Sequence, residues 1–239
     1  MVEQYFSQYK QDKFINEVVF NNKSAGFFID IGAHDGVTIN NSIFFERYRN
    51  WTGVCIEPNP NVFERLIENR KSININKCIG KENKKVIFTQ ITGYSEMLSG
   101  IADKYHPNHI KRIDNLILRK GDLKNDIELG MITLDSIMDI RNKDIDFISI
   151  DTEGNEFEIV SSIDFKILNI NCLIIENNYA DNRINEYLNL WDFKLLSKLD
   201  VDEVYVKKQN INFGVIMRLY MWKFKIFYKR VIEKIRSLF

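Results

Sequence analysis

A ten-residue stretch near the start of the chain, Phe27 to Gly36, constrains the fold more than any other feature. Its apolar run ends in Asp30-x-Gly32, and Gly36 closes a short polar turn before a segment with helical spacing at 42–48. A strand, a tight glycine-containing turn and a helix, in this order, open a nucleotide-binding α/β sheet. Such glycines let a ligand approach the backbone, and the helix N-terminus offers unpaired N–H groups. An ordinary strand–helix turn has the same pattern, so the stretch alone leaves ligand binding open.

Apolar runs that end in a carboxylate recur along the chain. Glu57 follows the run at 53–56, Asp151 follows the run at 145–150, and Glu176 follows the run at 172–175. Helical segments separate these runs, which predicts a mostly parallel sheet with right-handed crossovers.

The last two expected strands, at 193–199 and 203–207, lie too close for a crossover and predict an antiparallel hairpin. A mostly parallel seven-stranded sheet that ends in such a hairpin is the α/β, Rossmann-like fold of class I S-adenosylmethionine (SAM) dependent methyltransferases. We therefore expect this fold, followed by a C-terminal amphipathic helix.

The 239 residues suit one α/β domain with small additions. We expect a helical lead-in at 1–24, the α/β domain at 25–210 and a basic amphipathic helix at 211–239. Within the domain, the segment 92–130 is polar and broken by glycines and a proline. It predicts a long irregular insertion that acts as a lid.

The C-terminal segment differs in charge from the rest of the chain. Seven basic residues and one acidic residue follow position 212, so this tail carries +6 and the preceding residues −6. On a helical wheel of about 100° per residue, its apolar side chains gather on one side and its basic side chains on others. This pattern predicts either peripheral membrane contact through 213–239 or packing on the domain or on a second subunit through the same helix. The acidic body argues against nucleic acid as a partner. The apolar set comprises Tyr220, Met221, Phe224, Phe227, Tyr228, Val231, Ile232, Ile235 and Leu238.

Three cysteines, Cys55, Cys78 and Cys172, lie in apolar strand-like runs. An odd number, no CxxC pair and no secretory leader predict buried free thiols in a reducing, cytoplasmic compartment. No run of about 18 apolar residues predicts a membrane-spanning helix. A membrane-bound tail would place the protein at the inner face of a membrane.

The acidic residues at the strand ends predict a shared site, because ligands bind beyond the carboxyl ends of parallel strands. Asp30, Glu57, Asp151 and Glu176 would repel one another there unless a positive or hydroxyl-rich group lay among them. Glu57 follows Gly32 by 25 positions. A carboxylate at that position accepts both hydroxyls of a ribose, which indicates a nucleoside ligand.

The turn discriminates between two such ligands. A dinucleotide needs G-x-G-x-x-G, whereas this chain has Ala33-His34-Asp35 after its glycine. Asp35 would oppose a pyrophosphate but would accompany a sulfonium and an ammonium. The residues favour SAM over NAD, with an NAD-dependent oxidoreductase as an alternative.

The chain resembles the FkbM family of SAM-dependent methyltransferases. The resemblance runs over about residues 5 to 208 and rests on FFIDIGAHDGVTINNSIFFE, GVCIEPNP, MLSG, ITLDSI, DFISIDTEGNEFEIV, IIENNYADNRI and EVYV. It implies methyl transfer from SAM to a hydroxyl, often on a sugar of a surface glycan or on a small molecule. One departure is Asn177, where relatives often have histidine.

The resemblance also implies roles for individual residues. Asp151 and Glu153 would lie beside the transferring methyl group, and Glu57 would hold the ribose. Pro58 and Ile79 would lie near the adenine. The methionine end of SAM would be held by the turn residues Asp30, Gly32, Ala33, Asp35 and Gly36, with His34 as a structural member of the turn.

A hydroxyl nucleophile needs a base, and the candidates are Asp151, Glu153 and Glu176, with Glu153 or Glu176 preferred. His106 and His109 are expected to be solvated. The same acids would suit Mg²⁺, although no Cys or His spacing indicates a metal centre and we assign no metal ligand. A further alternative is a scaffold that keeps the fold without activity.

Overall fold

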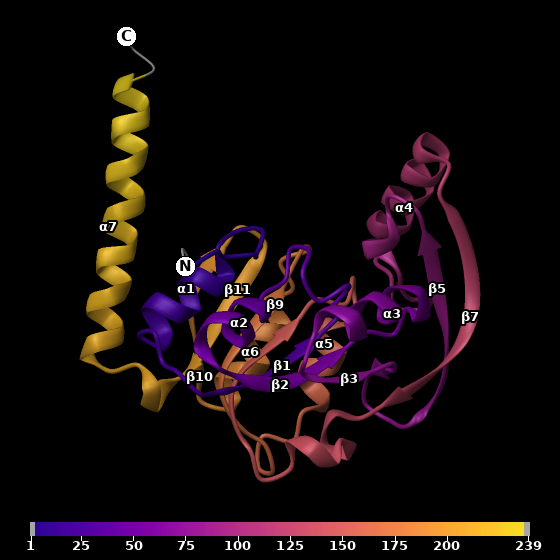
Figure 1. Cartoon of the computed structure of the whole chain (residues 1–239), viewed down its shortest axis with the longest axis horizontal. Helices are drawn as coiled ribbons and strands as arrows, with labels where there is room; N and C mark the ends of the chain where they lie inside the picture. Colours follow the sequence, from indigo (N-terminus) through magenta and orange to yellow (C-terminus); the bar gives the residue numbers. More distant parts are fainter. Residues whose placement is uncertain (1–2, 237–239) are drawn as a thin grey trace.

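The computed structural model describes residues 3–236 of the chain. Its central element is a seven-stranded sheet in the order β10-β11-β9-β8-β1-β2-β3 (Figure 1). Strand β11 runs antiparallel to both of its neighbours, whereas β9, β8, β1, β2 and β3 are mutually parallel. The predicted fold class is therefore confirmed. The strands are β1 (Phe27–Ile31), β2 (Thr52–Ile56), β3 (Ile73–Ile75), β8 (Asp144–Ile150), β9 (Asn169–Glu176), β10 (Phe193–Leu199) and β11 (Asp202–Lys207).

The sheet is buried on both faces, as its continuous apolar strands require. Along β1, Ile29 and Ile31 join one hydrophobic cluster with α5 (Glu156–Ser162) and α6 (Asn182–Leu190). Phe28 points to the opposite face and joins the cluster formed with the helices α2 and α3. These two helices span Ile43–Arg49 and Pro60–Asn69.

Helix α3 begins with a side-chain cap. The Asn59 side chain accepts a hydrogen bond from the Asn61 N–H at 3.2 Å, and Pro60 occupies the first turn. This cap fixes the chain directly after β2, so that Glu57 and Pro58 stay at the edge of the sheet where the site lies.

The insertion at 92–130 is not irregular, and this prediction is wrong. It contributes to a second sheet in the order β4-β7-β5-β6, and it contains the helix α4 (Pro107–Lys120). Pro107 begins this helix and does not break the chain, and Gly121 ends it in the left-handed region at φ 73°. The strands are β4 (Cys78–Ile79), β5 (Lys84–Thr92), β6 (Gly100–Ile101) and β7 (Leu123–Ile132), with the short helix η2 (Glu96–Leu98) before β6.

The two ends of the chain pack together beside the main sheet. The lead-in forms α1 (Gln11–Phe14) and the π-helical turn η1 (Ile15–Val19), and the tail forms α7 (Phe213–Arg236). The Trp222 ring contacts the Phe14 ring edge-on at 5.3 Å, and the Arg218 Nε donates to the Val18 carbonyl at 2.9 Å. Beyond these contacts α7 projects away from the domain (Figure 1). The remaining short helices are η3 (Leu134–Ser136), η4 (Met138–Ile140) and η5 (Lys208–Asn210).

All three cysteines are buried free thiols, as predicted. Among residues 3–236, no helix combines the length and the apolar character needed to cross a bilayer.

Arg70, the residue after α3, fastens the β1 turn to the neighbouring helices. Its buried guanidinium donates to the Gly36 carbonyl at 3.1 Å, to the Ser42 hydroxyl at 2.9 Å and to the Glu46 carboxylate at 3.1 Å. Ser42 in turn donates to the buried Asp30 carboxylate. The Arg70 guanidinium thus offsets the negative charge of both Glu46 and Asp30, and it ties the β1 turn to α2.

Replacing Arg70 with Ala should lower the free energy of unfolding by about 3–5 kcal/mol, because it leaves Asp30 and Glu46 without their cation. The matched control is Arg183→Ala, which removes an exposed pair with Asp181 and should cost less than about 1 kcal/mol. Urea unfolding measures both. Equal losses in the two variants would contradict the role given to Arg70.

Candidate active site

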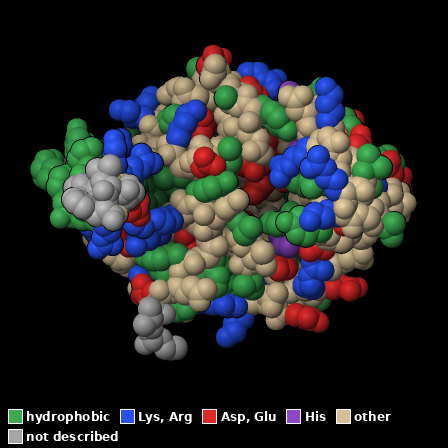
Figure 2. Space-filling model, turned by 90° about the horizontal axis from the view of Figure 1, so that it is seen from above, with side chains coloured by type: hydrophobic (Ala, Val, Ile, Leu, Met, Phe, Trp, Pro, Cys, Tyr) green, Lys and Arg blue, Asp and Glu red, His purple; other side chains and the backbone are tan. Residues whose placement is uncertain are grey.

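A cavity opens at the carboxyl ends of β1, β2 and β8. Figure 2 shows the hollow, with acidic side chains in its interior. Its walls come from the β1 turn, the end of β2, β4, the segment 96–101 of the insertion and the turn after β8. The predicted residues that line it are Gly32, His34, Glu57, Pro58, Ile79, Asp151 and Glu153.

Gly32 allows two walls of the cavity to touch. Its φ is +82°, and a Cβ placed on it would lie 1.7 Å from the Asp151 carbonyl oxygen. The Asp151 N–H donates to the Ile31 carbonyl at 3.0 Å, which keeps the two turns in register. Only glycine satisfies both the backbone angle and the close approach.

Glu57 is held by backbone N–H groups. One carboxylate oxygen accepts from the His34 N–H at 3.0 Å and the other from the Asn59 N–H at 2.8 Å. Burial raises the pKa of Glu57 to about 7, although these two hydrogen bonds act in the opposite direction. Each oxygen retains a lone pair, so the carboxylate can still accept hydroxyl groups from a ligand in the cavity.

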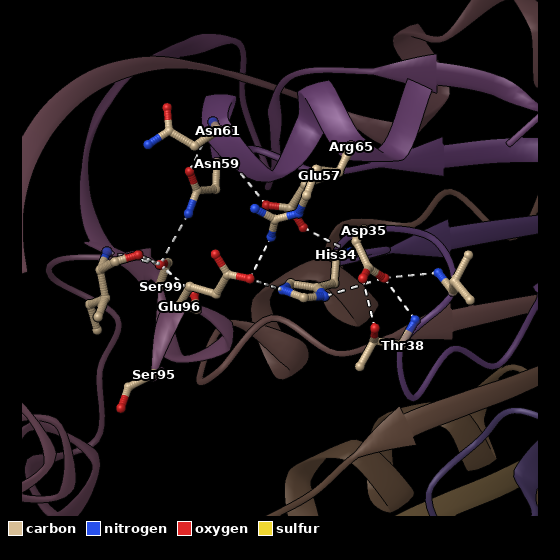
Figure 3. Close-up of polar contacts among 12 residues, drawn as sticks. His34, Asp35, Thr38, Glu57, Asn59, Asn61, Arg65, Ser95, Glu96 and Ser99 are labelled. Carbon is tan, nitrogen blue, oxygen red and sulfur yellow. Dashed lines mark hydrogen bonds and ion pairs between the residues drawn. The ribbon is translucent and has the colours of Figure 1, made fainter. Parts of the chain in front are cut away.

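His34 links the β1 turn to the insertion (Figure 3). Its Nε2 lies 3.2 Å from a Glu96 carboxylate oxygen, which also pairs with Arg65 on α3. Burial opposes charge on the ring, but the neighbouring Asp35 outweighs burial and raises the pKa of His34. A second link joins Asn59 to Ser99 at 3.3 Å. Through these contacts the segment 96–101 becomes a wall of the cavity.

Four predicted residues of the turn do not line the cavity. Asp30 accepts hydrogen bonds from Asn40 and Ser42, and Ala33 is buried in the core. Gly36 packs so closely against Arg70 that a Cβ would lie 2.5 Å from its side chain. These three residues lie on the side of the turn that faces away from the cavity, because side chains alternate along the strand and the turn is tight. Their contacts hold the turn in place.

Asp35 also serves the turn. Its carboxylate accepts from the N–H groups of Val37 at 2.9 Å and Thr38 at 2.7 Å. Burial would raise the pKa of Asp35, but hydrogen bonds from His34 and Thr38 outweigh it and lower the pKa below its usual range. The acid that the sequence assigns to the cofactor is thus occupied inside the turn.

Three carboxylates meet beside the cavity: one oxygen each of Asp151, Glu153 and Glu176 lie within 4.8 Å of one another. Asp151 opens to the cavity, although protein surrounds it on its other sides. Burial and then mutual repulsion raise the pKa of all three, that of Glu176 to about 8. Asp151 and Glu176 lie close enough to titrate as a pair, so their two protons are not independent.

His109 faces this cluster, and the expectation that it is solvated is wrong. The side chain lies on α4 with 1% of its surface exposed, stacked on Tyr105 at 4.9 Å. Its Nδ1 lies 3.4 Å from a Glu153 oxygen, and neither ring nitrogen has a hydrogen-bond partner among the described residues. Burial lowers the pKa of His109, so the ring is neutral at pH 7. His106 is exposed, as expected.

A second cavity adjoins the first. Glu153 lines the first cavity and its neighbour Gly154 the second, so the acidic cluster lies where the two meet. The second cavity is lined by polar groups that include Lys104 and Asn177. His106 and Tyr179, whose rings stack at 4.0 Å, also line it.

The acidic cluster predicts a specific pH dependence of stability. Glu176 has a pKa of about 8 in the folded chain and about 4.3 in an unfolded one. The native state therefore binds an extra proton between these values, and stability falls as the pH rises from about 4.3 toward 8. Glu176→Gln should flatten this decline in urea unfolding measured at about pH 5 and about pH 8. Exposed Glu186→Gln is the control and should retain it. A decline that persists unchanged in Glu176→Gln would contradict the assignment.

The fold and the site define the class of the protein as a class I SAM-dependent methyltransferase. Residues 30–201 match the Methyltransferase FkbM domain, so the chain belongs to the FkbM methyltransferase family. This match confirms the predicted family and enzyme class and sets aside the oxidoreductase alternative.

Other comparisons give distant likenesses. TrmK from M. capricolum in complex with S-adenosylhomocysteine has 9% identity and a TM-score of 0.41, with 84% of this chain and 68% of that chain covered. A protein of the NADB-Rossmann superfamily from Streptococcus agalactiae has 11% identity and a TM-score of 0.43, with 86% and 68% covered. Human methyltransferase 10 domain containing protein has 9% identity and a TM-score of 0.41, with 82% and 80% covered. No curated protein matches the sequence.

Proposed function

We propose that this enzyme transfers a methyl group from SAM to a hydroxyl of a sugar, in a surface glycan or a related metabolite. The observation that carries the proposal is the position of Asp151, Glu153 and Glu176. They lie where a cavity lined by apolar and acidic side chains meets a second cavity with a more polar lining. An acid cluster at such a junction can hold a cation on one side and accept a proton on the other.

The first cavity fits SAM. Glu57 has free lone pairs for the ribose hydroxyls, and Pro58 and Ile79 supply apolar surface for the adenine. The Oδ1 of Asn155, which lines the same cavity, is buried without a hydrogen-bond partner. A buried acceptor of this kind needs a donor, and the adenine amino group supplies one. The acidic cluster suits the positive sulfur and the ammonium group.

SAM brings a methyl group already activated on a positively charged sulfur, so the protein must position the acceptor and remove its proton. We assign proton removal to Glu153, because it lines the cavity, whereas Glu176 lies behind it in the pair with Asp151. A cation in the cavity lowers the pKa of these carboxyl groups, which makes Glu153 a competent base near neutral pH.

His109 is the positioning residue for this base. Its neutral ring faces Glu153 from the insertion at 3.4 Å and limits the directions in which the carboxylate can turn. Asn177 occupies the position where relatives often have histidine, and it lines the second cavity. His109 therefore supplies an imidazole to the same region from a different element.

The second cavity suits a sugar. Amide, carboxylate and ammonium groups line it and offer both donors and acceptors to hydroxyl groups. The stacked rings of His106 and Tyr179 offer an aromatic surface for the apolar face of a sugar ring. This combination favours a carbohydrate over an apolar acceptor.

A divalent cation is the alternative occupant of the acidic cluster, because Mg²⁺ prefers carboxylate oxygens. Methyl transfer that stops with a chelator and returns with Mg²⁺ would assign the cluster to a metal. Transfer that persists in the chelator would leave the acids as base and counter-charge.

The three free, buried thiols support a reducing, cytoplasmic compartment as the site of the reaction. Oxidising compartments favour cysteines in disulfides, and none of these thiols has a bonded partner within the described chain. Fractionation of cells that express the tagged protein tests the assignment, and recovery from a secreted fraction would oppose it.

Calorimetric titration with S-adenosylhomocysteine should show binding, and Glu57→Gln should weaken it by roughly tenfold or more, because a charged acceptor for two hydroxyls becomes a neutral amide. Exposed Glu64→Gln on α3 is the control and should bind like the wild type. No binding to the wild-type protein at millimolar ligand would favour a fold that has lost its activity.

Glu153→Gln should lower kcat by about 10²–10⁴-fold with saccharide acceptors, since it removes the base, while S-adenosylhomocysteine affinity changes little. His109→Gln should lower kcat less and shift the pH profile of kcat/KM, which a structural role alone would not do. Exposed Glu186→Gln should leave both parameters unchanged. Full activity in Glu153→Gln would contradict the assignment of Glu153 as the base and would point to Glu176.

A further inference from the structure

The outer face of α7 is apolar and lacks a partner among the described residues. The helix contacts the domain through Val215, Leu219 and Trp222, which occupy one side of the helical wheel. On the opposite side, Tyr220, Phe224 and Phe227 are 67%, 67% and 65% exposed. The domain contacts α7 only along its first turns, up to Trp222, and the rest of the helix projects from it with this face exposed (Figure 1). Exposed apolar side chains on the same arc are Phe213, Ile216, Met217, Met221, Tyr228 and Val231.

Basic side chains border this apolar face on both sides. At about 100° per residue, Lys223, Arg230 and Lys234 lie along one edge of the arc. Lys225, Lys229 and Arg236 lie along the other. Figure 2 views the helix end-on and shows hydrophobic side chains on the side away from the domain, with Lys and Arg on either flank. Of the predicted apolar set, Leu238 and the side chain of Ile235 lie outside what the structure describes.

We propose that α7 binds an anionic lipid surface, with its axis in the plane of the membrane and its aromatic face in the headgroup region. A helix with an aromatic and aliphatic face bordered by lysines and arginines has the pattern of an interfacial anchor. The basic borders would contact lipid phosphates while the apolar arc enters the headgroup region of the bilayer. Both features of the helix therefore fit an anionic membrane surface. No described helix spans a membrane, which fits contact along the surface.

A second copy of the chain fits this face less well. Six basic residues border the apolar arc, and within α7 the single acidic residue, Glu233, already pairs with Lys229 at 3.7 Å. Two such helices placed face to face would bring like charges together along both edges, at an energetic cost. An anionic surface instead neutralises both edges at once.

The proposal is tested with the full chain and two vesicle types, pure phosphatidylcholine and phosphatidylcholine that contains phosphatidylglycerol. Sedimentation should show binding to the anionic vesicles that weakens with salt, and little binding to the neutral ones. The double variant Phe224→Gln with Phe227→Gln should lower the partition coefficient roughly a hundredfold, because each aromatic ring taken out of water contributes about tenfold or more. Both positions are exposed, so the fold should be retained.

The matched control is Leu118→Gln with Leu123→Gln, which removes two exposed apolar side chains from the insertion and should leave binding unchanged. Vesicle binding that survives in the Phe224→Gln, Phe227→Gln variant would overturn the proposal. So would a wild-type protein that ignores anionic vesicles and forms a dimer in sedimentation equilibrium that the same variant abolishes. S-adenosylhomocysteine affinity should be equal in all variants.

Discussion

The close contact between Gly32 and Asp151 is the constraint on which the site depends. The backbone of the β1 turn meets the backbone of the β8 turn where no side chain would fit, since a Cβ would lie 1.7 Å from the Asp151 carbonyl oxygen. This contact brings the glycine turn, Glu57 and the acidic cluster to one cavity. Arg70 holds the turn from behind, and the Glu96 contacts hold it from the side of the insertion.

The second constraint is electrostatic. Asp151, Glu153 and Glu176 share a small volume in which burial disfavours charge. Burial and mutual repulsion raise the pKa of all three carboxyl groups, and a positively charged sulfonium beside them would lower it again. On the proposed function, this arrangement costs stability at neutral pH, favours a cationic cofactor and provides a base for the acceptor.

Local sequence patterns predicted the elements whose signals lie close together in the chain. The β1 turn and the carboxylates at the strand ends lie where expected. The strand β7 has only one apolar face, so its sequence resembles a polar loop, and α4 begins at Pro107, a residue that also marks breaks between elements. His109 and Glu96 depend on those elements and on charged partners more than 30 residues away, so no local pattern reveals them. The internal use of Asp30 and Asp35 depends on side-chain direction, which composition does not encode.

Proton release on cofactor binding tests the central claim most directly. SAM and S-adenosylhomocysteine differ in the charge on sulfur, so calorimetric titration of each near pH 7, in two buffers of different ionisation enthalpy, isolates the response of the acidic cluster. The account predicts that SAM releases more protons than S-adenosylhomocysteine, and that Glu176→Gln reduces the difference. Equal proton release for the two ligands would contradict the claim that the cluster faces the sulfonium.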